Sequence, residues 1–398
     1  MKMQSVFSRF LRKWRRPGAQ ASGPRPMGRC HESNRAHRTS AALHLTPRGL
    51  LSGFHDLGRG NSWSFLWMVA LLLITPQAAS AQDARLKPLI EGAKKEGKLQ
   101  IYAILVVTDH LQIIQRFKEK YPFIDVSLWR STGENIYNRV VTEARGNAHL
   151  VDVVGTSGFQ MYQLVKRGLM QKYQSPESAH YEPGFKDPAG FWTSYYVNPL
   201  VMAYNTKMLT PAQAPKSYED LVDPKWKGQL VMEEDEMEWF ATMKRFWGEE
   251  KTLTYLRRLA NQNYHFRKGH TLMTTLVAAG EYPGAVLLYA PQTQYTKSKG
   301  APIEWNPPNP TVVSLSLMGI TAKSPHPNAA RLYLDHMLSE EIQRDYISGK
   351  FFKLSARAGV SSLVQQRLKE VKLVPADITQ GEYLEKNTKE LREILLRR

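Results

Sequence analysis

Three short segments that carry hydroxyl side chains follow apolar runs typical of buried β-strands. They are Val106-Val107-Thr108, Ser131-Thr132-Gly133 and Thr156-Ser157-Gly158. A stretch with helical spacing follows each one, so each is predicted to place hydroxyls and free backbone N–H groups at a helix N-terminus. Such a terminus suits a carboxylate, phosphate or phosphonate, because the helix dipole is positive there. Ser and Thr are also ordinary helix caps, and it is the presence of three such segments at one predicted sheet edge that favours binding.

A second set of candidate residues is aromatic, acidic or close to a further predicted helix start. Tyrosine rings would pack over the organic body of a solute, and carboxylates would meet a cationic group. The carboxylates have a second interpretation, because the dipole of a helix N-terminus alone favours acidic residues beside it. The set consists of Tyr195, Tyr196, Glu233, Glu234, His270, Thr271 and Tyr289.

Strands and helices alternate in the part of the chain that positions these residues. Apolar runs at Leu99–Val107 and Leu150–Val154 predict buried strands, and helical spacing follows each of them. Thr108 and Thr271 are predicted helix caps. The alternation predicts a parallel sheet with both faces covered, which binds ligands at the carboxyl ends of its strands. Thr311–Ala322 is β-rich and predicts a strand that returns the chain to its first part, and Pro327–Leu338 and Glu340–Ile347 are predicted helices. A charged helix at Tyr383–Arg398 is predicted to pack on the outside.

An extended run at Tyr195–Tyr204 is interrupted only by Asn198-Pro199, a pair that belongs at an edge or a crossing point. The run ends in LVMAYNT, and Ser217–Gly228 reads SYEDLVDPKWKG. These motifs resemble those of type II periplasmic solute-binding proteins, the receptors of ABC importers. They are most similar to the subgroup that includes binders of ferric iron, organic cations and phosphonates. The resemblance extends over Asp83–Val360.

The resemblance implies an α/β chain with the type II periplasmic-binding-protein fold, in which two doubly wound α/β lobes are joined by extended hinge strands. The first lobe is expected to hold residues 82–198 plus 312–345, and the second 199–311 plus 346–398. A small polar solute would bind between the lobes and close the hinge, and an inner-membrane ABC permease would recognise the closed form. The resemblance further implies a periplasmic monomer, and it leaves the charge of the solute open.

Ferric-binding members of this family hold the metal with a pair of tyrosines, and by position that pair falls on Ala290-Pro291 here. Only Tyr289 is adjacent. Since Fe³⁺ prefers anionic oxygen ligands, we expect no tight ferric site and no other metal or cofactor. The alternative that stays open is a ferric-iron-binding protein with non-standard ligands, drawn from Tyr195, Tyr196, Tyr289 and Glu233.

Charge and composition limit the other function classes. The net charge of +18 is uneven, because residues 1–81 hold 12 Lys or Arg and only two acidic residues, which leaves +8 on the remainder. That remainder has no basic run with interleaved aromatic residues, so we expect no nucleic-acid partner. The single cysteine, Cys30, lies outside the predicted mature chain. The mature chain would therefore have no thiolate to act as a nucleophile or a metal ligand. The sequence contains no G-x-S-x-G, H-E-x-x-H or P-loop motif, so an enzyme on this fold is only the remaining alternative.

The N-terminal region predicts export. Trp63–Ile74 is an apolar run of the length of a signal-peptide core, and Ala79-Ser80-Ala81 is a small-residue cleavage site. We therefore interpret residues 61–81 as a signal peptide, with a mature start near Gln82 and a periplasmic location. Residues 1–60 are rich in Arg and poor in acids. They are interpreted as a disordered basic extension, or as the product of a start codon assigned too far upstream.

Overall fold

The computed structural model of the chain describes residues 75–234 and 236–396, which belong to one compact unit, Trp67–Arg398. The predicted basic extension and most of the predicted signal peptide lie outside the described residues. The backbone of residues 75–81 forms the start of helix α3, Thr75–Glu96, so cleavage after Ala81 stays a prediction. None of the helices in the described part of the chain has both the length and the apolar character that a membrane crossing requires.

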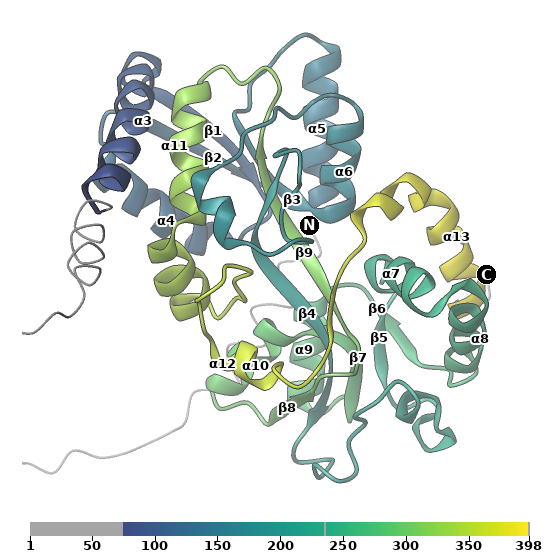
Figure 1. The fold of residues 1–398 in the computed structure, drawn as a ribbon. Helices are drawn as coiled ribbons and strands as arrows, with labels where there is room; N and C mark the ends of the chain where they lie inside the picture. Colours follow the sequence, from purple (N-terminus) through teal and green to yellow (C-terminus); the bar gives the residue numbers. More distant parts are fainter. Residues whose placement is uncertain (1–74, 235, 397–398) are drawn as a thin grey trace, which may run out of the picture. The chain divides into compact units, whose positions relative to one another are not determined.

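The first half of the described chain builds a parallel sheet with helices on both faces, as the alternating pattern predicts (Figure 1). Strand β1 is the centre of this part, because it pairs in parallel with both β2 and β3. The predicted strand Leu99–Val107 is too long, since residues 104–106 turn away to begin a helix. The elements are β1 (Lys98–Ala103), α4 (Val107–Lys120), β2 (Asp125–Arg130), α5 (Gly133–Arg145), β3 (Val153–Ser157) and α6 (Gly158–Lys166).

The second half repeats this plan around strand β5. This strand pairs in parallel with both β6 and β7, the latter at Gly284–Tyr289. The short strands and amphipathic helices of this half enclose a core of aromatic and aliphatic side chains that includes Trp239 and Phe240. The remaining elements are β5 (Val231–Glu233), α7 (Met237–Trp247), α8 (Glu249–Ala260), β6 (His265–Arg267), α9 (His270–Ala279), α10 (Ala290–Ser298) and β8 (Ile303–Asn306).

Two long strands connect the halves. Strand β4, Thr193–Asn205, pairs with β9, Thr311–Ile320, over its first seven residues. From Leu200 onward β4 pairs instead with β7 and β8. The change of partner follows Pro199, which the sequence predicts to lie at a crossing. The ten strands thus form one continuous mixed sheet, in the order β2-β1-β3-β9-β4-β7-β5-β6, with β8 on β4 and β10 on β9.

The C-terminal part of the chain returns to both halves. Helix α11, Pro327–Leu338, has the predicted bounds and packs against α3. The predicted helix Glu340–Ile347 is a π-helix, η5, at Ile342–Lys350. The short 3₁₀ helices η2 (Pro176–His180), η3 (Asp220–Val222) and η4 (Pro224–Trp226) lie in connections, and the chain ends with α12 (Leu363–Arg367), β10 (Leu373–Pro375), η6 (Ile378–Tyr383) and α13 (Leu384–Leu395).

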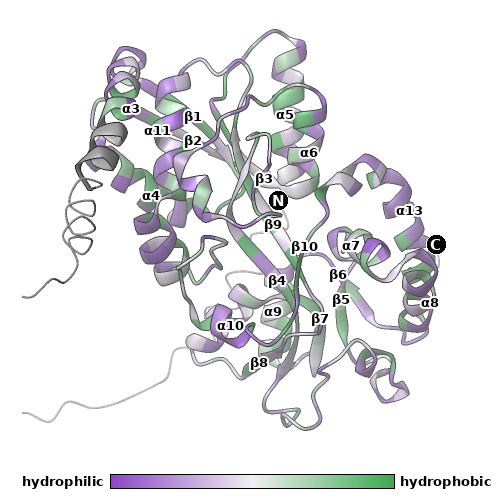
Figure 2. Cartoon of the chain, in the orientation of Figure 1, coloured by the Kyte–Doolittle hydropathy of each residue, from purple (hydrophilic) through white to green (hydrophobic). Residues whose placement is uncertain are grey.

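The buried apolar side chains come from the strands and from the inner sides of the helices, and Figure 2 shows the hydrophobic colour on both. Every residue of β4 and of β9 is buried, because helices and loops cover both faces of the central sheet. Asp152 is the main buried charge of the first half. Its carboxylate accepts four hydrogen bonds, from Gln100 N, Ser324 Oγ, His326 N and His326 Nδ1, at 2.6 to 2.9 Å.

Candidate functional site

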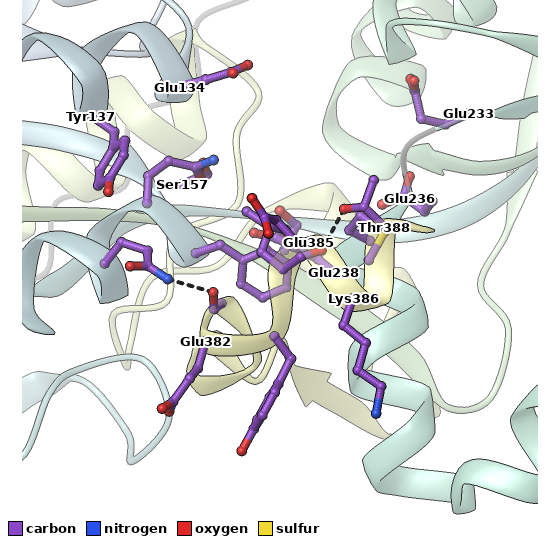
Figure 3. A pocket seen from close by; sticks show the side chains of 18 of the residues that line it. Glu134, Tyr137, Ser157, Glu233, Glu236, Glu238, Glu382, Glu385, Lys386 and Thr388 are labelled. Carbon is purple, nitrogen blue, oxygen red and sulfur yellow. Dashed lines mark hydrogen bonds between the residues drawn. The ribbon is translucent and has the colours of Figure 1, made fainter. Parts of the chain in front are cut away.

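A cavity of about 1070 Å³ lies where the carboxyl ends of strands from both halves meet. Its walls come from the start of α6, the start of α7, the start of α9, the end of β7 and the C-terminal segment. Figure 3 shows Glu134, Tyr137 and Ser157 on one side of this cavity and Glu233 and Glu236 on the other. The position agrees with the rule that open α/β sheets bind ligands beyond the carboxyl ends of their strands.

Glu238 lines the cavity from the first turn of α7. Its carboxyl group lies close to Gly158 and Ser314, since a Cβ atom placed on Gly158 would be 3.4 Å from Glu238 Oε1. Gly158 is the first residue of α6, and Ser314 lies in β9. Burial raises the pKa of Glu238 to about 7, although the nearby Ser314 hydroxyl and Gly158 N–H act in the opposite direction. A carboxyl group of the second half therefore faces the start of α6 in the first half.

Glu233 makes a similar contact within the second half. It is buried at the end of β5, and its Oε2 accepts a hydrogen bond of 2.6 Å from the backbone N–H of Gly269. Gly269 is the N-cap residue of α9, with φ of 107°, a backbone conformation that favours glycine. The carboxylate of Glu233 thus lies at the N-terminus of α9. Glu234 does not line the cavity, and its backbone N–H donates to the carbonyl of Arg267.

His270 and Tyr289 form a stacked pair at the cavity wall. Their ring centroids are 3.7 Å apart, with an angle of 31° between the planes. Burial lowers the pKa of His270 to about 3, so its ring is neutral near pH 7. The contact of 3.4 Å between His270 Nε2 and Glu236 Oε2 is therefore not an ion pair at that pH. Burial also raises the pKa of Tyr289 well above its usual range.

The three hydroxyl segments do not meet at this cavity. Val107 and Thr108 are exposed residues in the first turn of α4, and the predicted cap at Thr108 is wrong because the N-cap is Val106. Thr132 does cap α5, and its hydroxyl accepts from the N–H of Asn135. Of the remaining members of these segments, Ser131 accepts a hydrogen bond from the Asn135 side chain, Thr156 is buried against Gly133, and Ser157 alone lines the cavity.

Two further predictions concerned residues that the structure places elsewhere. Tyr195 is fully buried in the core of the first half, and Tyr196 packs against it edge-on with ring centroids 4.7 Å apart. Neither lines the cavity. Thr271 is exposed in the first turn of α9, and the predicted cap there is wrong because Gly269 holds the N-cap position. Because β4 is apolar and buried on both faces, its sequence does not reveal which tyrosine ring faces a cleft.

Residues 373–396, which we name the C-terminal strap, form a wall of the cavity that the sequence analysis did not find. Gln163 of α6 donates a hydrogen bond of 2.7 Å to the carbonyl of Gly381 in η6. Helix α13 packs against α7 and α8, and Lys244 of α7 forms an ion pair of 2.8 Å with Glu390. The helix thus packs on the outside of α7 and α8, and Glu385 and Lys386 of its first turn also line the cavity (Figure 3).

A second cavity of about 1050 Å³ has a different lining. It lies beside Phe191 and Trp192, and the strap contributes Val374 and Pro375 to it. None of the predicted site residues lines it. We therefore take the first cavity, which holds Ser157, Glu233, His270 and Tyr289 of the predicted set, as the candidate functional site.

The two α/β halves are joined by long shared strands and enclose a polar cavity. This is the architecture of a two-lobed solute receptor, and it differs from a catalytic site with an assembled nucleophile and base. The family model described as "Bacterial extracellular solute-binding protein" matches residues 149–373, which is more than half of the chain. The chain belongs to this family, whose members are binding proteins, and the resemblance seen in the sequence is confirmed.

Several curated and solved proteins are similar to the chain. The Fe(3+)-binding periplasmic protein of Serratia marcescens is 25% identical over 254 residues, which cover 60% of this chain and 73% of that protein. The periplasmic binding protein AfuA of Actinobacillus pleuropneumoniae, solved with fructose 6-phosphate, is 23% identical with a TM-score of 0.64, over 75% of this chain and 99% of that one. Iron-bound HitA of Pseudomonas aeruginosa is 23% identical with a TM-score of 0.63, over 74% and 99%. The solved structures show that the chain has the type II periplasmic-binding-protein fold predicted from its sequence.

Proposed function

We propose that this protein is the solute-binding component of an ABC importer and that it captures a small polar solute in the cavity between its lobes. The observation that carries the proposal is the position of the cavity. Its walls come from both lobes, and the lobes share the strands β4 and β9, about which they can rotate. Binding would then favour the closed form, because only that form brings both walls against the solute.

The family and its similar proteins support a periplasmic protein that delivers a small molecule to a permease. We propose that the chain is exported by cleavage near Gln82, acts as a monomer and divides into lobes of residues 82–198 plus 312–345 and 199–311 plus 346–398. Within the cavity, the stacked rings of His270 and Tyr289 offer a flat surface for an organic body, and Ser157 offers a hydroxyl from the opposite lobe.

A thermal-shift screen of solutes on the periplasmic protein tests the proposal. A ligand present at about one hundred times its Kd adds about 2.7 kcal/mol to the free energy of unfolding, which gives a clear rise in Tm. Tyr289→Ala should weaken binding of any solute that scores. The matched control is Tyr295→Ala, because Tyr295 is exposed and does not line the cavity. A solute that binds both variants and the unaltered protein equally would place the site elsewhere.

A ferric-binding protein with non-standard ligands is the second candidate, and the names of the Serratia protein and of HitA favour it. Tyr289 and Glu233 both line the cavity and offer oxygen ligands. The burial that raises the pKa of Tyr289 opposes a tyrosinate, and no cluster of three His, Cys, Asp or Glu suited to a metal occurs among the described residues. A purple or red colour on addition of ferric citrate, lost in Tyr289→Phe, would establish this candidate.

A further inference from the structure

Helix η6, the middle part of the C-terminal strap, is attached to the second half of the fold at both of its ends. The residue before it is Asp377. Its carboxylate accepts a hydrogen bond of 2.6 Å from Arg245 Nη1, and its backbone N–H donates to the Thr242 hydroxyl at 3.3 Å. Arg245 and Thr242 both belong to α7. The residues after η6 form α13, which packs against α7 and α8. The ends of η6 therefore move with α7.

The body of η6 lies on the first half instead. Gln163 Nε2 donates to the carbonyl of Gly381 at 2.7 Å, and the Tyr162 hydroxyl donates to Glu382 Oε2 at 2.9 Å. Both donors belong to α6. The backbones also approach closely, because a Cβ atom on Gly381 would lie 3.2 Å from the Cα atom and from the carbonyl oxygen of Phe159. Helix η6 thus reaches from α7 across to α6, beside the cavity that both helices line.

The two attachments of this part of the strap differ in strength. Helix α13 buries Leu391 and Leu395 completely or nearly so in the core of the second half. Among the described residues of η6, in contrast, only Gly381 is buried, and the hydrogen bond from Tyr162 is exposed. Buried leucine side chains contribute more to stability than exposed hydrogen bonds do. The contact between η6 and α6 is therefore the one that breaks when α6 and α7 separate.

We propose that η6 is a latch, which holds the two lobes together beside the cavity and leaves α6 when the cavity opens. Rotation of the lobes about β4 and β9 moves α7 away from α6, and η6 follows α7 because both of its ends are attached there. The inference rests on the proposed solute-binding function and adds a conformational control to it. Release of η6 precedes the entry of a solute, and its return to α6 completes closure.

The distance between two spin labels, one on each lobe, tests the latch without any solute. Arg145→Cys at the end of α5 and Arg257→Cys in α8 provide exposed positions for the labels. They are introduced into the full chain together with Cys30→Ser, which removes the single native cysteine. Pulsed electron paramagnetic resonance then gives the proportions of closed and open molecules. The unaltered latch should give one dominant, short distance.

Two variants weaken the latch in different ways. Gly381→Val directs a side chain at the backbone of Phe159, and the double variant Tyr162→Phe with Gln163→Ala removes both hydrogen bonds to η6. Each should raise the ratio of open to closed molecules by at least about fivefold, which is the effect of one lost hydrogen bond. Gly381→Ala, with a smaller side chain, takes the place of Gly381→Val if the valine variant does not fold.

Tyr137→Phe is the matched control, because the Tyr137 hydroxyl accepts a hydrogen bond of 2.8 Å from Arg167 Nε within the first half. Its loss should leave the distance between the labels unchanged. The proposal is overturned if the folded latch variants keep the distances of the unaltered latch, or if Tyr137→Phe opens the lobes as much as they do. A mainly open population with the unaltered latch would also overturn it. The absence of any solute in the thermal-shift screen would instead count against the proposed function alone.

Discussion

Replacement of Glu238 by glutamine should make the protein more stable at alkaline pH and should have little effect at acid pH. The ordinary pKa of a glutamate is 4.5, and burial raises that of Glu238 to about 7. Between these two values the folded state binds a proton that the unfolded state has lost. Stability is therefore fully present below pH 4.5 and falls as the pH rises through 7.

The size of the effect follows from the same difference in pKa. Each pH unit corresponds to about 1.4 kcal/mol, so an ionised Glu238 costs the folded state about 3 kcal/mol above pH 7. The residue as a whole keeps partial exposure, and solvent screening lowers this value, so we take about 1.5 kcal/mol as the smallest expected difference. Glutamine retains the shape and the acceptor oxygen but cannot ionise.

Urea unfolding at pH 5 and pH 8 gives the free energy of unfolding of the unaltered protein and of Glu238→Gln. The effect is the difference between the two proteins at pH 8 minus their difference at pH 5. Titrating groups common to both proteins, such as the buried His110 and His336, cancel in that comparison. Glu382→Gln serves as the control, because its side chain is exposed at the strap and should give the same difference at both pH values. If the advantage of Glu238→Gln were identical at pH 5 and pH 8, the carboxyl group would not be buried as described.

Other substitutions test the fold through the same unfolding measurements. Asp152→Ala leaves four partly buried donors without their acceptor and should lower the free energy of unfolding by about 3 kcal/mol; a loss below about 1 kcal/mol would contradict its role. Gly319→Ala would place a Cβ 2.3 Å from the carbonyl oxygen of Phe191, so we expect a loss of about 2 kcal/mol or more, and an unchanged midpoint would refute the close approach. Arg367→Ala removes a guanidinium 3.8 Å from the ring centre of Trp305 and should cost about 1 kcal/mol, which Arg367→Lys should restore only in part.

Much of the fold can be predicted from periodicity and turn residues. Strand β9 and helix α11 have nearly the predicted bounds, since a β-branched run and a Pro-initiated amphipathic stretch are strong local signals. Pro199 correctly indicates where β4 changes partner, because proline cannot take part in a regular central ladder. No local sequence pattern of this kind predicts where the C-terminal strap lies. Its contacts are set by which face of α13 meets α7, and that depends on the packing of the whole second lobe.

The site was predicted only in part. Glu233, His270 and Tyr289 line the cavity because each follows a strand or begins a helix at the expected edge. Glu238 was missed, although the acidic run before α7 was noted, since its contact with Gly158 joins residues 80 positions apart. Tyr195 was misplaced for the opposite reason. An aromatic residue in a strand buried on both faces carries no mark of the side that it faces, and here it packs into the core.

The C-terminal strap also affects the order in which the protein becomes functional during its synthesis. The chain is made from its N-terminus, so η6 and α13 emerge after all the other described elements. Both walls that meet Glu238 exist before that moment, but the cavity stays open on the side that residues 381–392 later cover. A chain that lacked residues 381–392 would keep all ten strands but would have no wall on that side of the cavity. Enclosure of the solute cavity therefore depends on the last of the described elements.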